Sequence, residues 1–212
     1  MRIALSGPSG VGKTTLCRYI EKVHGFSYLS TSAGHILEEH TKNILKSSFG
    51  YKGTGHRDVI NLSSSQPGFG KAFQEAVLMA RGKQIMMNEN FVIDRCPIDN
   101  VVYFLTQSAH NTDEEYCKKF IKMAVKNYLK LDLVIRVHWT NDILEVADNN
   151  SRVPNIVYQR FIDDVFNDSY YRYFGAFKSP KVINIGVWDL ETRKSIINDE
   201  IRVVQPKLPF NG

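Results

Sequence analysis

The sequence is poor in cysteine and contains no long apolar run. Its three cysteines, Cys17, Cys96 and Cys117, form no CxxC pair and are too few for a disulfide framework, so we expect reduced thiols. No apolar stretch approaches the roughly 20 residues that a membrane helix needs. The first apolar residues give way at once to Ser6 and glycines, which is unlike a signal peptide. These absences exclude disulfide scaffolds and membrane proteins, and we expect a soluble cytoplasmic protein.

Linkers, repeats and low-complexity segments are also lacking. No Ser/Gly-rich stretch divides the 212 residues, so we expect a single domain spanning 1–212. The net charge of +5 and the pI near 9.0 suit a protein that handles phosphates, and they permit nucleic-acid contact without requiring it. The densest basic segment, Lys118–Lys130, has the spacing of an amphipathic helix and indicates a solvated face rather than a DNA-binding stripe.

Short apolar segments alternate with helical patterns, which is typical of α/β proteins. Strands are expected at Arg2–Ser6, Phe26–Leu29, Phe91–Ile93, Leu131–Val137 and Val182–Ile185. Helices are expected at Gly12–His24, Ala33–Lys46, Phe69–Met87, Ile98–Gln107, Asp113–Leu129 and Asn155–Phe166, with a weaker helical pattern at Asn141–Ala147. Residues 51–70, rich in glycine and serine, are expected to form a loop with short helical pieces, and the tail 205–212 to be irregular. Nearly continuous apolar strands predict a five-stranded parallel sheet with helices on both faces and a ligand crevice at the carboxyl ends of the strands.

The segment after the first predicted strand fits the phosphate-binding pattern GxxxxGK[ST] in full. It comprises Gly7, Pro8, Ser9, Gly10, Val11, Gly12, Lys13 and Thr14, followed by Thr15, between a strand and a helix. Glycines let the backbone turn so that successive N–H groups point at phosphate oxygens, and the helix N-terminus adds its positive dipole. Lys13 is expected to reach the β- and γ-phosphates of ATP, and the Thr14 hydroxyl to bind Mg²⁺. The segment, a P-loop, predicts binding of a nucleoside triphosphate.

Other P-loop classes are disfavoured by the residues that come directly after the later strands. A GTPase needs an NKxD-type base-reading motif, and none follows Leu131–Val137. A motor ATPase ends a strand in adjacent acidic residues, whereas Phe91–Ile93 leads into Asp94 and Arg95. At a strand's carboxyl end, Asp94 can bind the Mg²⁺ shell or accept a proton from an attacking hydroxyl, and Arg95 can clamp phosphate oxygens. The alternative is a structural Asp–Arg ion pair.

A P-loop followed by an apolar strand that ends in Asp94-Arg95-Cys96-Pro97-Ile98-Asp99 resembles the P-loop nucleoside and nucleotide kinases. The likeness is to the thymidylate-kinase-like and deoxynucleoside-kinase branch, in which this strand ends in DR[ST]xxD. It is nearer to small kinases of bacteriophages and bacteria, which include 5-hydroxymethyluracil DNA kinases and nicotinamide-riboside kinases. The resemblance runs from residue 1 to about residue 185, with Cys96 in place of the usual Ser or Thr.

This resemblance implies a P-loop kinase fold with a small lid at about 139–154. The lid would carry Arg152, the last residue of Asn149-Asn150-Ser151-Arg152, a segment similar to DGxR. A closing arginine stabilises the transferring phosphoryl group and excludes water; the alternative is a surface arginine in a polar loop, and Arg160 is a weaker candidate. The implied cofactors are ATP and Mg²⁺, with Thr14 and Asp94 as metal ligands and Lys13, Asp94, Arg95 and Arg152 as catalytic residues. Related small kinases are often dimers, which leaves a homodimer open, since the sequence does not fix the oligomeric state. A phage-encoded member would act in the host cytoplasm.

The phosphate acceptor is expected to bind within residues 30–88. Polar candidates there are His35, His56, Arg57, Gln74 and Arg81, and aromatic candidates are Phe49, Tyr51, Phe69 and Phe73, of which the last two fit a helix core better. Three functions stay open: a (deoxy)nucleotide kinase for thymidylate or a modified pyrimidine nucleotide, a kinase for the hydroxyl of a nucleoside or of a modified base in DNA, and a regulatory P-loop ATPase. The sequence does not distinguish ATP from GTP as donor.

Overall fold

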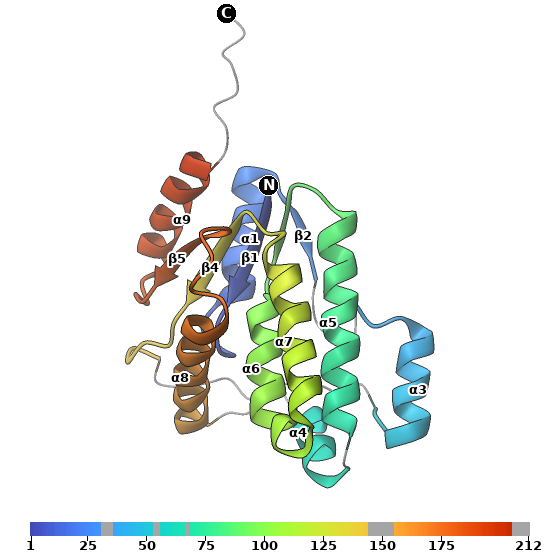
Figure 1. Cartoon of the computed structure of the whole chain (residues 1–212). Coiled ribbons are helices and arrows are strands. Elements are labelled where there is room, and N and C mark those ends of the chain that lie inside the picture. Colours follow the sequence, from blue (N-terminus) through green and yellow to red (C-terminus); the bar gives the residue numbers. More distant parts are fainter. Residues whose placement is uncertain (31–35, 53–55, 67, 144–154, 205–212) are drawn as a thin grey trace, which may run out of the picture.

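A computed structural model of the chain describes residues 1–30, 36–52, 56–66, 68–143 and 155–204. Its five strands form one parallel sheet in the order β2-β3-β1-β4-β5 (Figure 1). The strands are β1 (Arg2–Ser6), β2 (Ser27–Leu29), β3 (Phe91–Ile93), β4 (Leu133–Val137) and β5 (Lys181–Ile185). The register joins Ile3 to Val92 on one side and to Leu133 on the other. The predicted α/β fold with a five-stranded parallel sheet is therefore confirmed.

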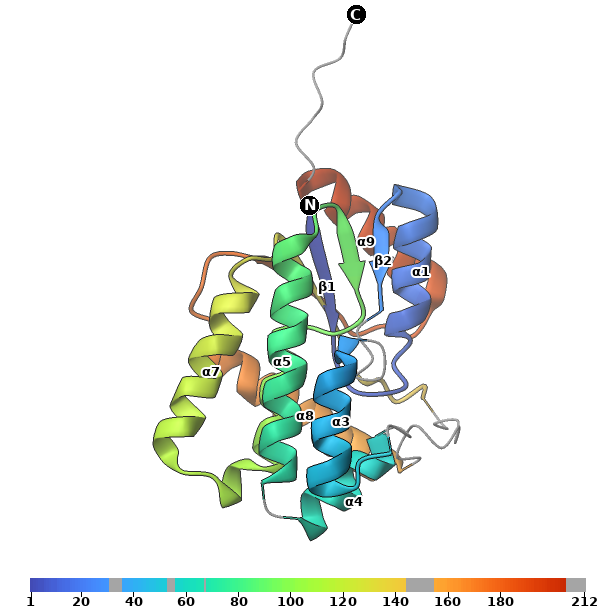
Figure 2. The same ribbon diagram turned by 90° about the vertical axis from the view of Figure 1, so that its right-hand side faces the viewer.

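Helices cover both faces of the sheet, because alternate strand residues are apolar on each side. On one face, α1 (Lys13–His24) and α9 (Leu190–Val204) pack on Ile3, Leu5 and Ile135. On the other face, Ala4 and Val134 contact a layer of four helices. These helices are α5 (Phe69–Met87), α6 (Pro97–Gln107), α7 (Glu114–Tyr128) and α8 (Ile156–Tyr173), and a short 3₁₀ turn, η1 (Ala109–Asn111), joins α6 to α7. The three layers are seen edge-on in Figure 2, with β1 between α1 and α5.

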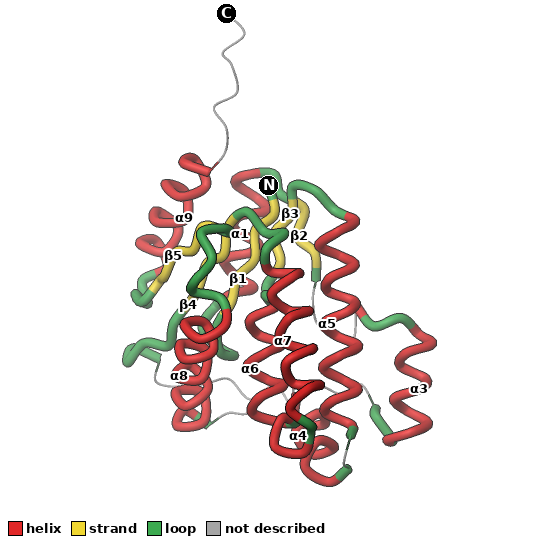
Figure 3. Tube along the Cα trace, viewed as in Figure 1, coloured by secondary structure: helices red, strands yellow, loops and turns green. Residues whose placement is uncertain are grey.

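Two further helices, α3 (Glu39–Phe49) and α4 (His56–Ser65), lie beside α5 and extend past the sheet (Figure 3). They form a third apolar cluster with the first half of α5, which includes Leu45, Tyr51, Val59 and Phe73. This cluster lies on the side to which the carboxyl ends of the strands point. It therefore forms one wall of the region in which parallel sheets bind ligands.

Three sequence-based expectations need correction. Residues 56–65, expected as a loop with short helical pieces, form one continuous ten-residue helix. In it the hydroxyls of Ser64 and Ser65 donate to carbonyls one turn earlier and so tolerate a helical backbone. The helix expected from Asn155 continues to Tyr173, seven residues past its expected end. No element is predicted at 190–204, where α9 buries Ile197 and Ile201.

Smaller differences concern helix boundaries. The helix expected at 33–46 begins at Glu39, and residues 141–143 form a turn rather than the start of a helix. Residues 33–35 of the first expected helix and 144–147 of the second lie outside the described residues. The tail 205–212 and most of the expected lid also lie outside them. Among the described residues, none of the helices is both long enough and apolar enough to span a membrane.

Candidate active site at the carboxyl ends of the strands

The P-loop joins β1 to α1 and depends on glycines with unusual backbone angles. Gly7 has φ of 142°, and a Cβ at this position would lie 2.1 Å from the carbonyl oxygen of Val137. Gly12, which precedes α1, has φ of 88°, in the left-handed region. The backbone of the P-loop thus packs directly against β4, which a side chain at Gly7 would prevent. In P-loops, a turn of this kind aims successive N–H groups at a phosphate.

Lys13 is buried, with 6% of its surface exposed, at the start of α1. Its ammonium group donates to the carbonyl oxygens of Gly7 at 2.8 Å and of Pro8. Burial, assisted by the nearby positive charge of Arg95, lowers the pKa of Lys13 to about 7. The lysine is thus held inside the P-loop, where an anionic ligand would favour its charged form.

Asp94 lies at the end of β3, beside the P-loop. Its Oδ2 accepts a hydrogen bond from the Thr14 hydroxyl at 2.9 Å and one from the Tyr28 hydroxyl at 2.9 Å. Burial and the neighbouring Asp94 carboxylate raise the pKa of Tyr28 above its usual range, and the guanidinium of Arg18 lies 4.1 Å from the Tyr28 ring centroid. The structure therefore brings together Thr14 and Asp94, the two residues predicted to hold Mg²⁺.

Tyr28 is a site residue that the sequence analysis misses. It occupies the middle of β2, where an aromatic residue is an ordinary strand former, so its identity alone gives no functional signal. Only the parallel pairing of β2 with β3, which sets Tyr28 opposite Val92, brings its hydroxyl to Asp94 two residues further on.

Arg95 forms its salt bridge with Asp99, not with Asp94. Its Nη1 donates to Asp99 Oδ1 at 3.0 Å and to the Tyr103 hydroxyl at 3.4 Å. Burial opposes the charged form of Arg95, but Tyr103 and Asp99 outweigh it and raise the pKa of Arg95 above its usual range. The other oxygen of Asp99 accepts from the Cys96 backbone N–H, which caps α6. Arg95 therefore carries a fixed positive charge, and its proximity depresses the pKa of Lys13.

A chain of buried polar side chains connects α5 with α6 next to this charged group. Arg81 donates to Asn100 Oδ1 and to the Cys96 carbonyl, Asn100 donates to Gln74 at 3.4 Å, and Gln74 donates to Gln107 at 3.3 Å. Burial lowers the pKa of Arg81 to about 10, which still leaves it charged at neutral pH. The Nε of Arg81 and the Nε2 of Gln107 are buried donors for which the described residues provide no partner. Of the predicted acceptor candidates, Gln74 and Arg81 therefore lie in one network.

The aromatic candidates have a different role. Phe49, Tyr51, Phe69 and Phe73 pack on one another with ring centroids 5.4–5.7 Å apart and belong to the cluster formed by α3, α4 and α5. The preference of Phe69 and Phe73 for the core is confirmed. Tyr51 is buried with them, whereas Phe49 is only partly buried, so a stacking role of Phe49 stays a prediction.

Several predicted site residues lie where no side chain is described. His35 and Arg152 are outside the described residues, and the side chains of His56 and Arg57 are not described although both residues lie in α4. The lid and its arginine therefore stay predictions. Arg160 is exposed on α8, which fits ordinary solvation.

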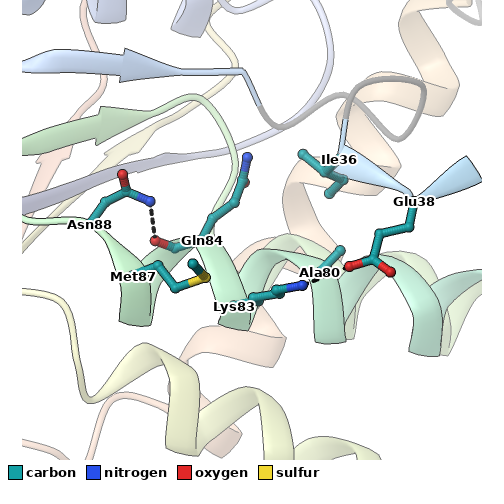
Figure 4. A pocket seen from close by; sticks show the side chains of 7 residues that line it. All are labelled: Ile36, Glu38, Ala80, Lys83, Gln84, Met87 and Asn88. Carbon is teal, nitrogen blue, oxygen red and sulfur yellow. Dashed lines mark hydrogen bonds and ion pairs between the residues drawn. The ribbon is translucent and has the colours of Figure 1, made fainter.

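A pocket of about 320 Å³ lies on another face of α5 (Figure 4). It is bordered by Ile36, Glu38, Ala80, Lys83, Gln84, Met87 and Asn88. Lys83 and Glu38 form a salt bridge across it at 2.7 Å, and Gln84 donates to the Ser30 carbonyl at 3.3 Å. Helical periodicity directs positions 80, 83, 84 and 87 away from the face that carries Gln74 and Arg81. None of the P-loop residues lines this pocket, so it is separate from the charged group at the strand ends.

The residues present fit a magnesium–triphosphate ligand. Mg²⁺ prefers oxygen ligands and is usually held by one or two protein groups together with phosphates and water. The Thr14 hydroxyl and the Asp94 carboxylate supply two such oxygens 2.9 Å apart. Within the described residues no group of three or more His, Cys, Asp or Glu side chains forms a metal site, so a metal here would depend on the phosphates of its nucleotide.

Comparisons with known proteins agree with this architecture. A family model described as AAA domain matches residues 2–174. Deoxyadenosine kinase from M. mycoides, with products dCMP and a flexible dCDP bound, is similar in structure, with a TM-score of 0.62 and 17% identity over 97% of this chain and 100% of that one. Thymidylate kinase from Candida albicans has a TM-score of 0.57 and 12% identity over 95% of this chain and 90% of that one.

The YorR protein from Bacillus subtilis, in complex with phosphorylated GDP, has a TM-score of 0.51 and 13% identity over 96% of this chain and 98% of that one. No curated protein matches this chain in sequence. The sheet with helices on both faces is therefore the P-loop kinase fold found in nucleotide kinases.

Proposed function

This chain belongs to the AAA domain family, and we propose that it is an ATP- and Mg²⁺-dependent kinase that transfers the γ-phosphoryl group to a (deoxy)nucleotide such as thymidylate or a modified pyrimidine nucleotide. The observation that carries the proposal is the hydrogen bond between Thr14 of the P-loop and Asp94 at the end of β3. It joins a triphosphate-binding loop to a carboxylate, with the cations Lys13 and Arg95 close by. Phosphoryl transfer requires this combination of positioning and charge stabilisation.

Lys13 and the P-loop backbone bind the donor's phosphates in this proposal. The lysine's hydrogen bonds to the Gly7 and Pro8 carbonyls are exchanged for bonds to phosphate oxygens, which favour its charged form. Thr14 and Asp94 hold the Mg²⁺, which supplies neutralising charge at the β- and γ-phosphates. Arg95, kept charged by Asp99 and Tyr103, stabilises negative charge on the phosphoryl group in transit.

The acceptor side is assigned to the polar network between α5 and α6. Amide groups such as those of Gln74 and Asn100 can both donate to and accept from the edge of a base. The positive charges of Arg81 and Arg95 near this network favour an anionic acceptor, which a nucleotide is and a nucleoside is not. The buried donors Arg81 Nε and Gln107 Nε2 provide further capacity for hydrogen bonds.

A second candidate is a kinase for a hydroxyl, either of a nucleoside or of a modified base such as 5-hydroxymethyluracil in DNA. Two observations favour it: the likeness to deoxyadenosine kinase and the net charge of +5, which suits contact with a polyanion. Asp94 would then accept the proton of the attacking hydroxyl.

The test is transfer from γ-labelled ATP with Mg²⁺ to dTMP, to a panel of nucleosides and to DNA that contains hydroxymethyluracil. Labelled dTDP supports the nucleotide kinase, whereas label found only in nucleosides or only in DNA replaces it by the second candidate. Phosphate release that no acceptor stimulates would favour a regulatory ATPase. A Lys13→Met variant serves as the inactive control and Lys22→Met, on the same helix, as the matched one.

A further inference from the structure

Arg193 is a buried arginine in the first turn of α9, far in sequence from the P-loop. Only 2% of its surface is exposed. The start of α9 is fixed by Asp189, whose carboxylate accepts from the backbone N–H and the hydroxyl of Thr192 at 2.7 Å. Asp189 therefore sets the position from which the Arg193 side chain extends toward the P-loop.

The guanidinium of Arg193 contacts two loops at once. Its Nη1 donates to the Val11 carbonyl oxygen at 2.6 Å, and its Nε donates to the carbonyl of Val187. Its central carbon lies 4.9 Å from the ring of Trp188, which is 42% exposed. A Cβ added to Gly12 would lie 3.4 Å from Nη1, so the guanidinium packs directly against the P-loop backbone.

Arg193 has no acidic partner among the described residues, so an ion pair does not explain why it is buried. Burial lowers the pKa of Arg193, and no carboxylate in the described part of the chain counteracts this effect. Within the described residues its hydrogen bonds go to backbone carbonyls, and its Nη2 is a buried donor with no partner. Burying an arginine without an acidic partner is unfavourable. The position therefore calls for a benefit beyond packing.

The Val11 carbonyl belongs to the same planar peptide unit as the N–H of Gly12. In a trans peptide unit the C=O and the N–H point in opposite directions. A donor that holds the Val11 oxygen from outside therefore aims the Gly12 N–H toward the inside of the loop. This is the direction required of the N–H groups that bind phosphate in a P-loop.

We propose that Arg193 is a positioning residue of the donor site, which holds the Val11–Gly12 peptide unit for phosphate binding and ties the P-loop to the turn that carries Trp188. This inference rests on the proposed binding of a nucleoside triphosphate and adds α9 to the residues that determine it. Lysine at this position would keep one charged donor but not the two divergent N–H groups that reach Val11 and Val187 together.

The experiment measures ADP and ATP binding by isothermal titration calorimetry for the wild type, Arg193→Met, Arg193→Lys and the control Arg202→Met, an exposed arginine on the same helix. We expect Arg193→Met to raise the Kd of both nucleotides at least about tenfold, the scale of one lost charge-assisted hydrogen bond. Arg193→Lys should give an intermediate Kd, and Arg202→Met that of the wild type. A role confined to stability would lower the number of binding sites per chain and leave the Kd unchanged.

Wild-type Kd values in Arg193→Met would overturn the inference. If that variant does not fold, Arg193→Lys decides alone: a Kd raised at least about threefold supports the inference, and an unchanged Kd overturns it. Because nucleotide binding is measured, the two proposals fail separately. If the wild type binds ATP but phosphorylates no acceptor, the kinase proposal is refuted and the proposed role of Arg193 is not. If the wild type phosphorylates an acceptor and Arg193→Met binds nucleotides with the wild-type Kd, the role of Arg193 is refuted and the kinase proposal is not.

Discussion

Replacing Lys13 with methionine should abolish phosphoryl transfer and at the same time stabilise the free protein. Burial and the charge of Arg95 lower the pKa of Lys13 from 10.5 to about 7. A change of this size corresponds to a cost of about 5 kcal/mol for holding the charged lysine in the fold, at 1.36 kcal/mol per pKa unit. Methionine cannot form the lysine's hydrogen bonds to the Gly7 and Pro8 carbonyls, a loss of about 3 kcal/mol. Methionine has a similar volume, so Lys13→Met should gain about 2 kcal/mol at pH 7.

The gain should depend on pH in a defined direction. Because the lysine pKa is lower in the folded than in the unfolded state, the folded wild type binds fewer protons between pH 7 and 10.5. Its stability therefore rises with pH in this window, by at most about 1.4 kcal/mol per pH unit. Below pH 7 the cost is present in full. The advantage of Lys13→Met should be largest there and should disappear near pH 9.

Urea unfolding of both proteins at several values between pH 6 and 9 measures this difference. Saturating MgATP provides the internal control, since ligand at 100 times its Kd adds about 2.7 kcal/mol to a protein that binds it and little to the variant. Parallel stability curves of wild type and variant across pH 7–9 would refute the reasoning. A variant that is less stable than the wild type at pH 6 would refute it as well.

Three further substitutions test the site. Asp94→Asn should lower kcat by about 10²–10⁴-fold while ATP binding persists, because the carboxylate is lost but not the P-loop; unchanged kcat in steady-state assays would remove Asp94 from the mechanism. Tyr28→Phe removes one of the two hydroxyls that hold Asp94 Oδ2 and should lower kcat about tenfold at constant KM for ATP, so a change in KM alone would contradict this role. Gly7→Ala places a methyl group 2.1 Å from the Val137 oxygen at φ of 142°. It should lower the free energy of unfolding in urea by more than about 2 kcal/mol and prevent ATP binding. A stable variant that binds ATP would contradict the close approach of the P-loop to β4.

The sequence predicts those features whose signals are local. Each strand is a short apolar run, and the P-loop is a contiguous pattern of glycines, lysine and threonine, so both are found close to their observed places. The approach of Thr14 to Asp94 also follows from local signals. Asp94 comes directly after β3, and Thr14 lies at the start of the helix that the P-loop joins to β1, the parallel neighbour of β3.

Other features depend on contacts between distant residues. The Arg193–Val11 hydrogen bond spans 182 positions and the Tyr28–Asp94 hydrogen bond spans 66. Nothing in the sequence around Arg193 or Tyr28 distinguishes either residue from an ordinary helix or strand residue. The aromatic residues Phe49 and Tyr51 are indistinguishable in sequence from a base-stacking pair, because their packing against Phe69 and Phe73 of α5 is a tertiary effect. The serine-rich helix α4 contradicts local propensity and forms because Val59 and Leu62 pack on the neighbouring helices.

The central position of β1 has a consequence for protein synthesis. Its two partners, which begin at Phe91 and Leu133, follow it by about 90 and 130 positions in the chain. At about 5–20 residues per second, a ribosome needs on the order of 10 s to produce Leu133 after Ile3. Both edges of the apolar strand β1 are open until β3 has been made, and one edge stays open until β4 follows. An unpaired apolar strand of this kind aggregates or recruits chaperones. The P-loop therefore reaches its binding conformation only after these two strands have been made, although it precedes both of them in the chain.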